Sequence, residues 1–185
     1  MRNVAEHVTI SREIENKAAE MRHTPWSAPE VKAFIEAIKG NRMFAVMLLA
    51  LIADRPAKVC GLRWDDVDLD GAGTIAIGNT RTIAYDRSLE RGERNKAVEK
   101  GAKSDAGERT LPAPAPVSRA LRAFRALQAQ EKLKAGEGYE SSGYVLVDEL
   151  GRPWKTDKLR REAYKLMAAG VRKVRLYDAR HACLS

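Results

Sequence analysis

The sequence has 185 residues, 44% of them apolar, and its 33 Lys and Arg residues against 25 Asp and Glu residues give a net charge of +8. This length and apolar content predict one folded domain and exclude a wholly disordered chain. The longest apolar run, Met43–Ala53, is about half the ~20 residues of a membrane span, and the N-terminus lacks the apolar core of a secretory signal. We therefore expect a cytoplasmic protein with no membrane partner, and its positive charge favours a polyanion such as DNA.

The first 23 residues are polar and predict an arm or interdomain linker, so residues 24–185 are expected to form the domain. Ser27 and Glu30 have the spacing of a helix-capping box, and the apolar residues that follow recur at helical spacing. Gly40 is expected to end this first helix.

The next segments predict core helices and then short strands. Arg42–Ala53 is almost wholly apolar and predicts a central helix, and a short helix is expected over Pro56–Leu62. Short β-like runs follow at Thr74–Ile77, Thr82–Tyr85, Arg109–Leu111 and Tyr144–Val147. Residues 86–107 are charged with almost nothing to bury, which predicts a mobile loop.

Two further helices are expected at Pro116–Ala135 and Thr156–Ala169, and the segment from Arg175 is expected to enter another. The apolar face of the first comprises Val117, Leu121, Phe124, Leu127 and Leu133. Both helices are rich in arginine, at Arg119, Arg122, Arg125, Arg160 and Arg161. The pattern predicts an α+β fold, mainly α-helical with a small antiparallel sheet.

Cys60 and Cys183 lie far apart, and both stand in apolar surroundings. No cysteine or histidine spacing indicates a metal site, so we expect small buried thiols, no metal and no cofactor.

Three segments, in this order, carry the chemistry of the sequence. They are LIADRPAKVCGLRWDDVDL (Leu51–Leu69), KSDAGERTLP (Lys103–Pro112) and RLYDARH (Arg175–His181). Together they resemble the first arginine box, the catalytic-lysine hairpin and the His-x-x-Arg box of the tyrosine recombinases, or phage-type integrases. The resemblance implies the catalytic-domain fold of that family, without its last helices.

The resemblance also implies cleavage of a DNA strand by a tyrosine hydroxyl, without a metal or cofactor. Arg55 and Arg180 match the two arginines that stabilise the charge on the scissile phosphate, a task suited to permanently charged, bidentate guanidinium groups. Lys103 matches the general acid that protonates the departing 5′-oxygen, and His181 matches a supporting hydrogen-bonding residue. The alternative readings are a helix-end arginine for Arg55 and a solvated loop charge for Lys103.

The sequence departs from the family at several positions. Lys58 stands where the family usually has an acidic residue, and Tyr177 replaces the histidine of the His-x-x-Arg box. The family's nucleophilic tyrosine lies some tens of residues beyond the second arginine, whereas five residues follow Arg180 here. None of the tyrosines present matches that nucleophile, so we expect the chain to be catalytically inactive.

We therefore expect a DNA-binding remnant of a phage or prophage site-specific integrase that binds double-stranded DNA. One alternative is an active strand-transferase whose tyrosine is supplied in trans by a partner chain. Another is a DNA-binding regulator unrelated to recombination. Self-association, or binding to other recombinase subunits, is left open by these observations.

Overall fold

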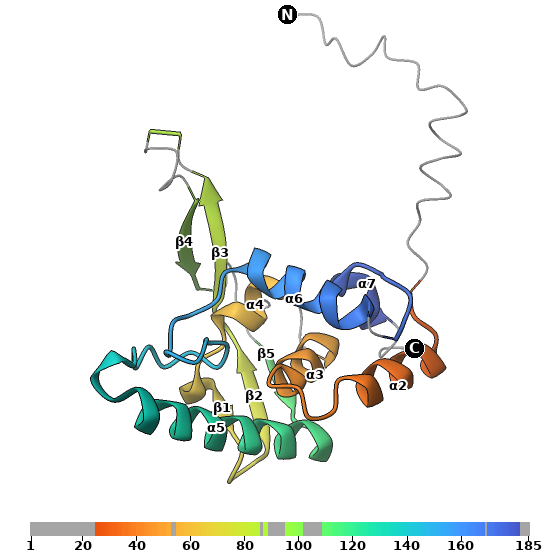
Figure 1. Cartoon of the computed structure of the whole chain (residues 1–185), viewed down its shortest axis with the longest axis horizontal. Helices are drawn as coiled ribbons and strands as arrows, with labels where there is room; N and C mark the ends of the chain where they lie inside the picture. Colours follow the sequence, from red (N-terminus) through yellow and green to blue (C-terminus); the bar gives the residue numbers. More distant parts are fainter. Residues whose placement is uncertain are drawn as a thin grey trace, which may run out of the picture.

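A three-stranded antiparallel sheet and a separate two-stranded ribbon are combined with helices (Figure 1). The computed structural model describes residues 25–52, 55–85, 87–88, 95–101, 109–168 and 170–181. The sheet has the order β1 (Val67–Asp68), β2 (Thr74–Ile77), β5 (Arg109–Pro112), and the ribbon pairs β3 (Thr80–Tyr85) with β4 (Asn95–Lys100). The predicted mainly helical fold with a small antiparallel sheet is confirmed.

The first helix, α2 (Ala28–Ala37), begins at the predicted capping box. The Ser27 amide donates to Glu30 Oε2 at 2.8 Å, and Arg172 Nε donates to Glu30 Oε1 at 3.0 Å. These bonds, that of Arg172 foremost, lower the pKa of Glu30 from 4.5 to about 2. After the helix the backbone turns at Gly40 with a φ of +80°, a conformation that favours glycine.

The centre of the domain is α3 (Phe44–Ile52), whose residues Ala45–Leu51 are all buried. A helix that is apolar all round must be covered on every side, as the sequence predicted. The short helix α4 (Pro56–Gly61) follows it, and α7 (Leu176–His181) packs against α3 with Leu176 and Ala179 buried. In the part of the chain that the structure describes, no helix is long and apolar enough to cross a membrane.

The remaining helical elements are α5 (Ala115–Ala135), α6 (Thr156–Ala168) and the short 3₁₀ segments η2 (Trp64–Asp66) and η4 (Gly136–Gly138). Val117, Leu121 and Phe124 of α5 are buried as predicted, but Leu133 is 85% exposed. Nine residues beyond Phe124, Leu133 points to the opposite side of a helix with 3.6 residues per turn. The inner face continues instead through Gln128, which is buried although it is polar.

Strand β4 contradicts the loop expected over residues 86–107. Its residues Asn95–Lys100 pair along their whole length with Tyr85–Thr80 of β3. The strand escapes a hydrophobic-pattern search because Lys96, Ala97 and Glu99 are exposed and Val98 is only half-buried. It is held by backbone pairing rather than by burial, and so carries no apolar alternation.

The prediction of a regular strand at Tyr144–Val147 is also wrong. Tyr144 and Val147 form single β-bridges, to Arg63 and Pro153 respectively, and all four residues of the segment are buried. Backbone bonds connect the segment to its surroundings on both sides, including Val145 N to Leu62 O at 2.9 Å. An apolar run of this kind indicates a segment that is buried on both sides. It does not show whether the segment is a hydrogen-bonded strand of a sheet or an extended stretch of the core.

Candidate functional site

Arg55 lies at the start of α4, directly before Pro56. Its extended backbone, with φ −74° and ψ 153°, lets its carbonyl accept a hydrogen bond from Lys58 N at 2.8 Å. The Arg55 side chain is exposed, and we find no hydrogen bond or ion pair for it among the described residues. An exposed guanidinium at the end of the core helices is available to an anionic ligand.

The other predicted catalytic residues lie largely outside the described part of the structure. The backbone of Arg180 and His181 belongs to α7, but their side chains are not described, and Lys103 falls in the undescribed range 102–108. The structure does bring α7 against α3, the helix that precedes Arg55 in the chain. The assignment of Arg55, Lys103 and Arg180 to one site therefore stays a prediction.

The two departures from the family pattern lie in α4 and α7. Lys58 is half-buried in α4. Tyr177 lies in the first turn of α7 and is 42% exposed, and its neighbour Asp178 forms an ion pair with Arg175 at 3.3 Å. Lys58 comes three residues after Arg55, and Tyr177 comes three residues before Arg180.

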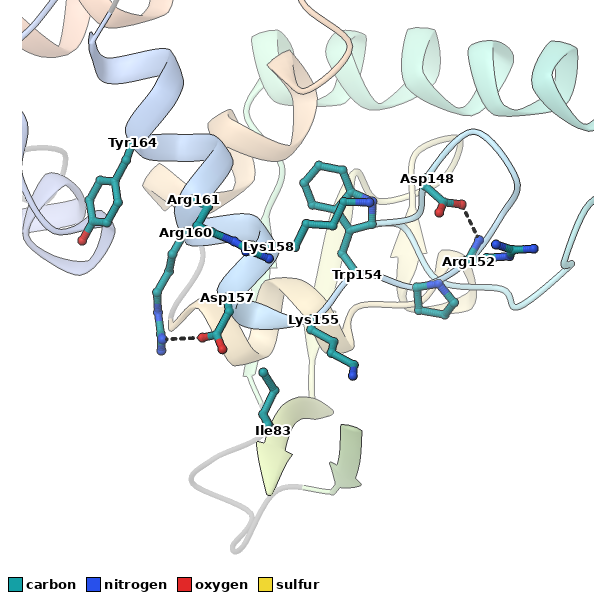
Figure 2. A pocket seen from close by; sticks show the side chains of 11 residues that line it. Ile83, Asp148, Arg152, Trp154, Lys155, Asp157, Lys158, Arg160, Arg161 and Tyr164 are labelled. Atoms are coloured by element: carbon teal, nitrogen blue, oxygen red, sulfur yellow. Dashed lines mark hydrogen bonds and ion pairs between the residues drawn. The ribbon is translucent and has the colours of Figure 1, made fainter. Parts of the chain in front are cut away.

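A surface cleft of about 730 Å³ opens between β3, α6 and the loop that precedes α6, and we refer to it as the basic cleft (Figure 2). Its lining residues are Ile83, Asp148, Arg152, Pro153, Trp154, Lys155, Asp157, Lys158, Arg160, Arg161 and Tyr164. Ile83 projects from the ribbon toward the side chains of α6 (Figure 2). The ribbon and α6 are thus two walls of one cleft.

The basic cleft carries more positive than negative charge, with five Lys and Arg side chains against two carboxylates. All five cationic residues are exposed. Asp157 binds Arg160 at 3.0 Å, and Asp148 accepts the backbone N–H of Arg152 at 2.9 Å. Because the five cations outnumber the two carboxylates, the cleft keeps a net positive charge that attracts phosphate groups.

Arg160 and Arg161 were expected from the sequence, whereas Arg152, Lys155 and Lys158 were not. A signal for Lys158 was present in the periodicity of α6. Its buried residues are Thr156, Leu159, Ala163 and Met167. Any residue off this buried stripe faces outward, so the cations around it share the exposed side of the helix.

The arginines of α5 do not belong to the basic cleft, whose lining residues come from β3, residues 148–155 and α6. Figure 1 shows α5 on one side of α3 and α6 on the other. Arg122 donates to the carbonyl of Leu69, and Arg125 lies 5.7 Å from the centroid of the Trp64 ring. The two arginine-rich helices therefore do not form one continuous basic surface.

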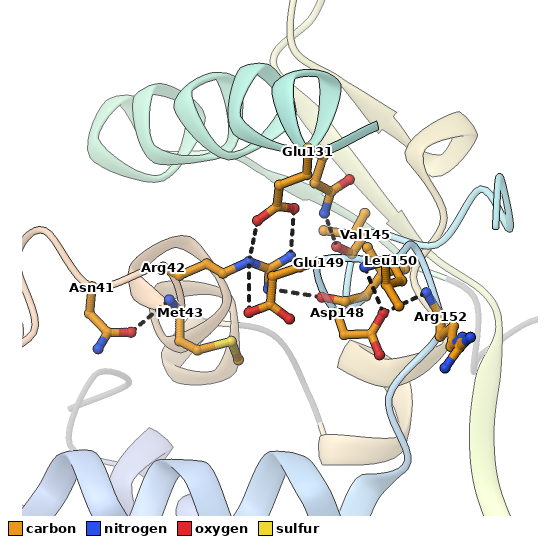
Figure 3. Close-up of polar contacts among 11 residues, drawn as sticks. Asn41, Arg42, Met43, Glu131, Val145, Asp148, Glu149, Leu150 and Arg152 are labelled. Atoms are coloured by element: carbon orange, nitrogen blue, oxygen red, sulfur yellow. Dashed lines mark hydrogen bonds and ion pairs between the residues drawn. The ribbon is translucent and has the colours of Figure 1, made fainter. Parts of the chain in front are cut away.

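Arg42 forms a half-buried polar network that joins the turn before α3 to α5 and to the 144–147 segment (Figure 3). Its guanidinium donates to both carboxylate oxygens of Glu131, at 2.7 and 2.8 Å, and to the carbonyl of Val147 at 2.9 Å. Burial lowers the pKa of Arg42, but the hydrogen bonds and charge of Glu131 outweigh this effect and raise the pKa above its ordinary value. With its donors occupied, Arg42 stabilises the fold rather than serving as a binding group.

Cys60 is fully buried in α4, as predicted for a structural thiol. Burial raises its pKa to about 12, and the nearby charges of Arg81 and Arg160 only partly oppose this. A thiol that stays protonated is a poor nucleophile, which agrees with a packing role. Cys183 lies outside the described residues.

Solved structures of DNA recombinases have this fold. The Tn1549 transposon integrase in complex with transposon right end DNA matches 96% of this chain and 59% of its own, with a TM-score of 0.59 and 13% identity. XerA recombinase matches 96% of this chain and 54% of its own, with a TM-score of 0.59 and 21% identity. At these identities the likeness establishes the fold, that of the tyrosine recombinase catalytic domain.

Sequence relatives name the family. A tyrosine recombinase XerC-like protein of Caldanaerobacter subterraneus subsp. tengcongensis is 32% identical over 162 residues, which are 84% of this chain and 41% of the relative. An integrase of Streptomyces ambofaciens is 29% identical over 133 residues, 71% of this chain and 32% of the relative. No protein-family model matches the chain. The chain belongs to the tyrosine recombinase family, and it spans less than half the length of these two relatives.

Proposed function

We propose that this chain is the DNA-binding part of a phage-type site-specific integrase, and that it binds duplex DNA through the basic cleft. The observation that carries the proposal is the cluster of five exposed cationic side chains that α6 and the loop before it present to one cleft. In this proposal residues 24–185 are catalytic domain and residues 1–23 are the linker that precedes it.

Duplex DNA suits the cleft because its backbone presents closely spaced phosphates to a row of cations. Such contacts orient a protein on the duplex but carry little sequence information. The related fold of the Tn1549 integrase, which was solved with transposon DNA, supports the choice of DNA over other polyanions.

The proposal predicts salt-sensitive duplex binding with little sequence preference. Binding constants measured by fluorescence anisotropy at several salt concentrations should give a steep negative slope of log K against log salt, with about 0.9 units for each phosphate contact. An integrase attachment-site duplex and a random duplex of equal length should bind with similar affinity. Absence of duplex binding at ~50 mM salt would overturn the proposal.

We further propose that the 185-residue polypeptide does not itself form a covalent bond to DNA. Arg55, Arg180 and Lys103 would still stabilise a bound phosphate, but none of them supplies the attacking oxygen. Among the tyrosines, the Tyr144 hydroxyl donates to the Glu99 carboxylate, and Tyr177 occupies the place of the family's histidine. Water as the attacking group would give hydrolysis without any protein–DNA bond.

This second proposal predicts no adduct on a nicked suicide substrate, either for the parent chain or for Tyr177→His. Restoring an imidazole at this position adds at most ~10²–10⁴ in rate through proton transfer, and nothing without a nucleophile. Denaturing gel electrophoresis with labelled DNA measures the adduct directly. An adduct that disappears in Tyr177→Phe would identify Tyr177 as a nucleophile and contradict the proposal.

A further inference from the structure

The β3–β4 ribbon extends beyond the helices of the domain (Figure 1). Among its side chains that the structure describes, none is buried; they are half-buried or exposed. An isolated two-stranded ribbon of this length is at best marginally stable in water. Its position relative to α6 therefore depends on the contacts at its base.

One of these contacts is a close approach of two backbones. A Cβ atom added to Gly61, the last residue of α4, would lie 2.9 Å from Arg81 N and from Asn79 O. Only a glycine permits this approach without displacing one of the two backbones. It fixes the first residues of β3 against α4.

Arg81 supplies a second set of contacts, which reach the loop before α6. Its Nη1 donates to the carbonyl of Trp154 at 2.7 Å, two residues before α6 begins. Its Nε lies 3.8 Å from Glu99 Oε1, and Glu99 is the residue directly opposite Arg81 in β4. The Arg81 side chain is only 14% exposed. One guanidinium thus connects both strands of the ribbon to the loop before α6.

Tyr144 completes this arrangement from the core side. Two guanidinium groups lie near its ring, with the carbon of Arg81 at 5.4 Å and that of Arg63 at 4.8 Å from the ring centroid. Its hydroxyl donates to the Glu99 carboxylate. Burial, together with this bond, raises the pKa of Tyr144, which keeps the hydroxyl protonated as a donor.

The face of the ribbon that carries these contacts also faces the basic cleft. Alternate residues of a strand share one face, so Ile83 lies on the same side of β3 as Arg81. Ile83 lines the basic cleft. Whatever fixes Arg81 therefore fixes the wall of the cleft that faces α6.

We propose that Arg81, assisted by Tyr144 and Glu99, is a positioning residue that holds the β3–β4 ribbon at a fixed distance from α6. This keeps the basic cleft open for a DNA backbone without any contact between Arg81 and phosphate. The inference rests on the proposed function of the cleft. When the ribbon loses its attachment it occupies the binding position for only part of the time, and the apparent affinity falls by that fraction.

Two substitutions test the proposal on the intact chain. Arg81→Met keeps most of the aliphatic stem and removes the polar contacts, and Tyr144→Phe removes only the hydroxyl, with no change of charge. Both should speed amide exchange across β3 and β4 but not across α3. If the ribbon is in place about a tenth of the time, duplex affinity falls about tenfold in Arg81→Met, and less in Tyr144→Phe. The slope of log K against log salt should stay that of the parent chain.

The salt slope distinguishes positioning from direct contact, because the loss of one phosphate contact makes the negative slope shallower by about one. A shallower slope in Arg81→Met would overturn the proposal. Faster amide exchange in the ribbon with unchanged duplex affinity would do so as well. Unchanged exchange in both variants would do so too. If Arg81→Met does not fold, Tyr144→Phe alone decides. If the parent chain binds no duplex, the proposed function fails, whereas the exchange data still report whether Arg81 holds the ribbon.

Discussion

We expect Arg160→Ala/Arg161→Ala to weaken duplex binding about tenfold or more near 0.1 M salt, because two phosphate contacts and their counterion release are lost. Both residues are exposed on α6 and line the basic cleft. The slope of log K against log salt should become shallower by about two. Anisotropy titrations of parent and variant with the same duplex measure both quantities.

The matched control removes two arginines from another side of the domain. Arg119→Ala/Arg125→Ala changes the net charge by the same amount, but both residues belong to α5, which does not line the basic cleft. The control should keep the parent slope and lose at most a few-fold in affinity through long-range charge, which salt screens. Equal effects of the two double substitutions would mean that net charge, rather than the cleft, controls binding.

Much of the fold followed from local pattern in the sequence. The capping box at Ser27 and Glu30, the apolar run of α3 and the periodicity of α6 each identified a helix within a few residues of its observed ends. These features depend on neighbours one to four positions away, which is the range that periodicity and capping can report.

The features that the sequence did not reveal depend on residues far apart in the chain. Strand β4 has no apolar alternation, and its pairing with β3 became visible only in the structure. The inner face of α5 becomes polar at Gln128, where the amide donates to Val145 O at 2.8 Å and its oxygen accepts from Trp64 Nε1 at 2.9 Å. A hydrophobic pattern cannot report a buried polar residue whose partners lie elsewhere in the sequence.

The same distinction holds for the candidate site. The spacing of the three motifs identified the family, which the relatives named recombinase and integrase bear out. The roles of Arg55, Lys103 and Arg180 stay predictions, because the side chains of Lys103 and Arg180 lie outside the described residues. The basic cleft required the structure, since it combines Ile83 of β3 with a helix that begins 73 positions later, at Thr156.

The largest effect on stability is expected at the ion pair of Arg42 and Glu131. Their side chains are 18% and 14% exposed, and 89 positions of sequence separate them. Removing one partner leaves the other charge poorly solvated, at a cost of about 3–5 kcal/mol for a well-buried pair. Because a domain of this kind is stable by only about 5–15 kcal/mol, we expect Arg42→Met to lower the unfolding midpoint in urea strongly.

A double-mutant cycle separates the ion pair from the loss of packing. Arg42→Met and Glu131→Leu should each destabilise the chain, and the combined variant should lose much less than the sum of the two, because neither charge is then left without its partner. The exposed pair of Lys39 and Glu36, 2.6 Å apart with side chains 58% and 55% exposed, is the matched control. Lys39→Met should cost less than about 1 kcal/mol, since water solvates the remaining carboxylate. If the losses of stability caused by Arg42→Met and Glu131→Leu are simply additive, the ion pair does not account for the stabilisation. The contacts of Arg42 with Phe124 and Val147 then do.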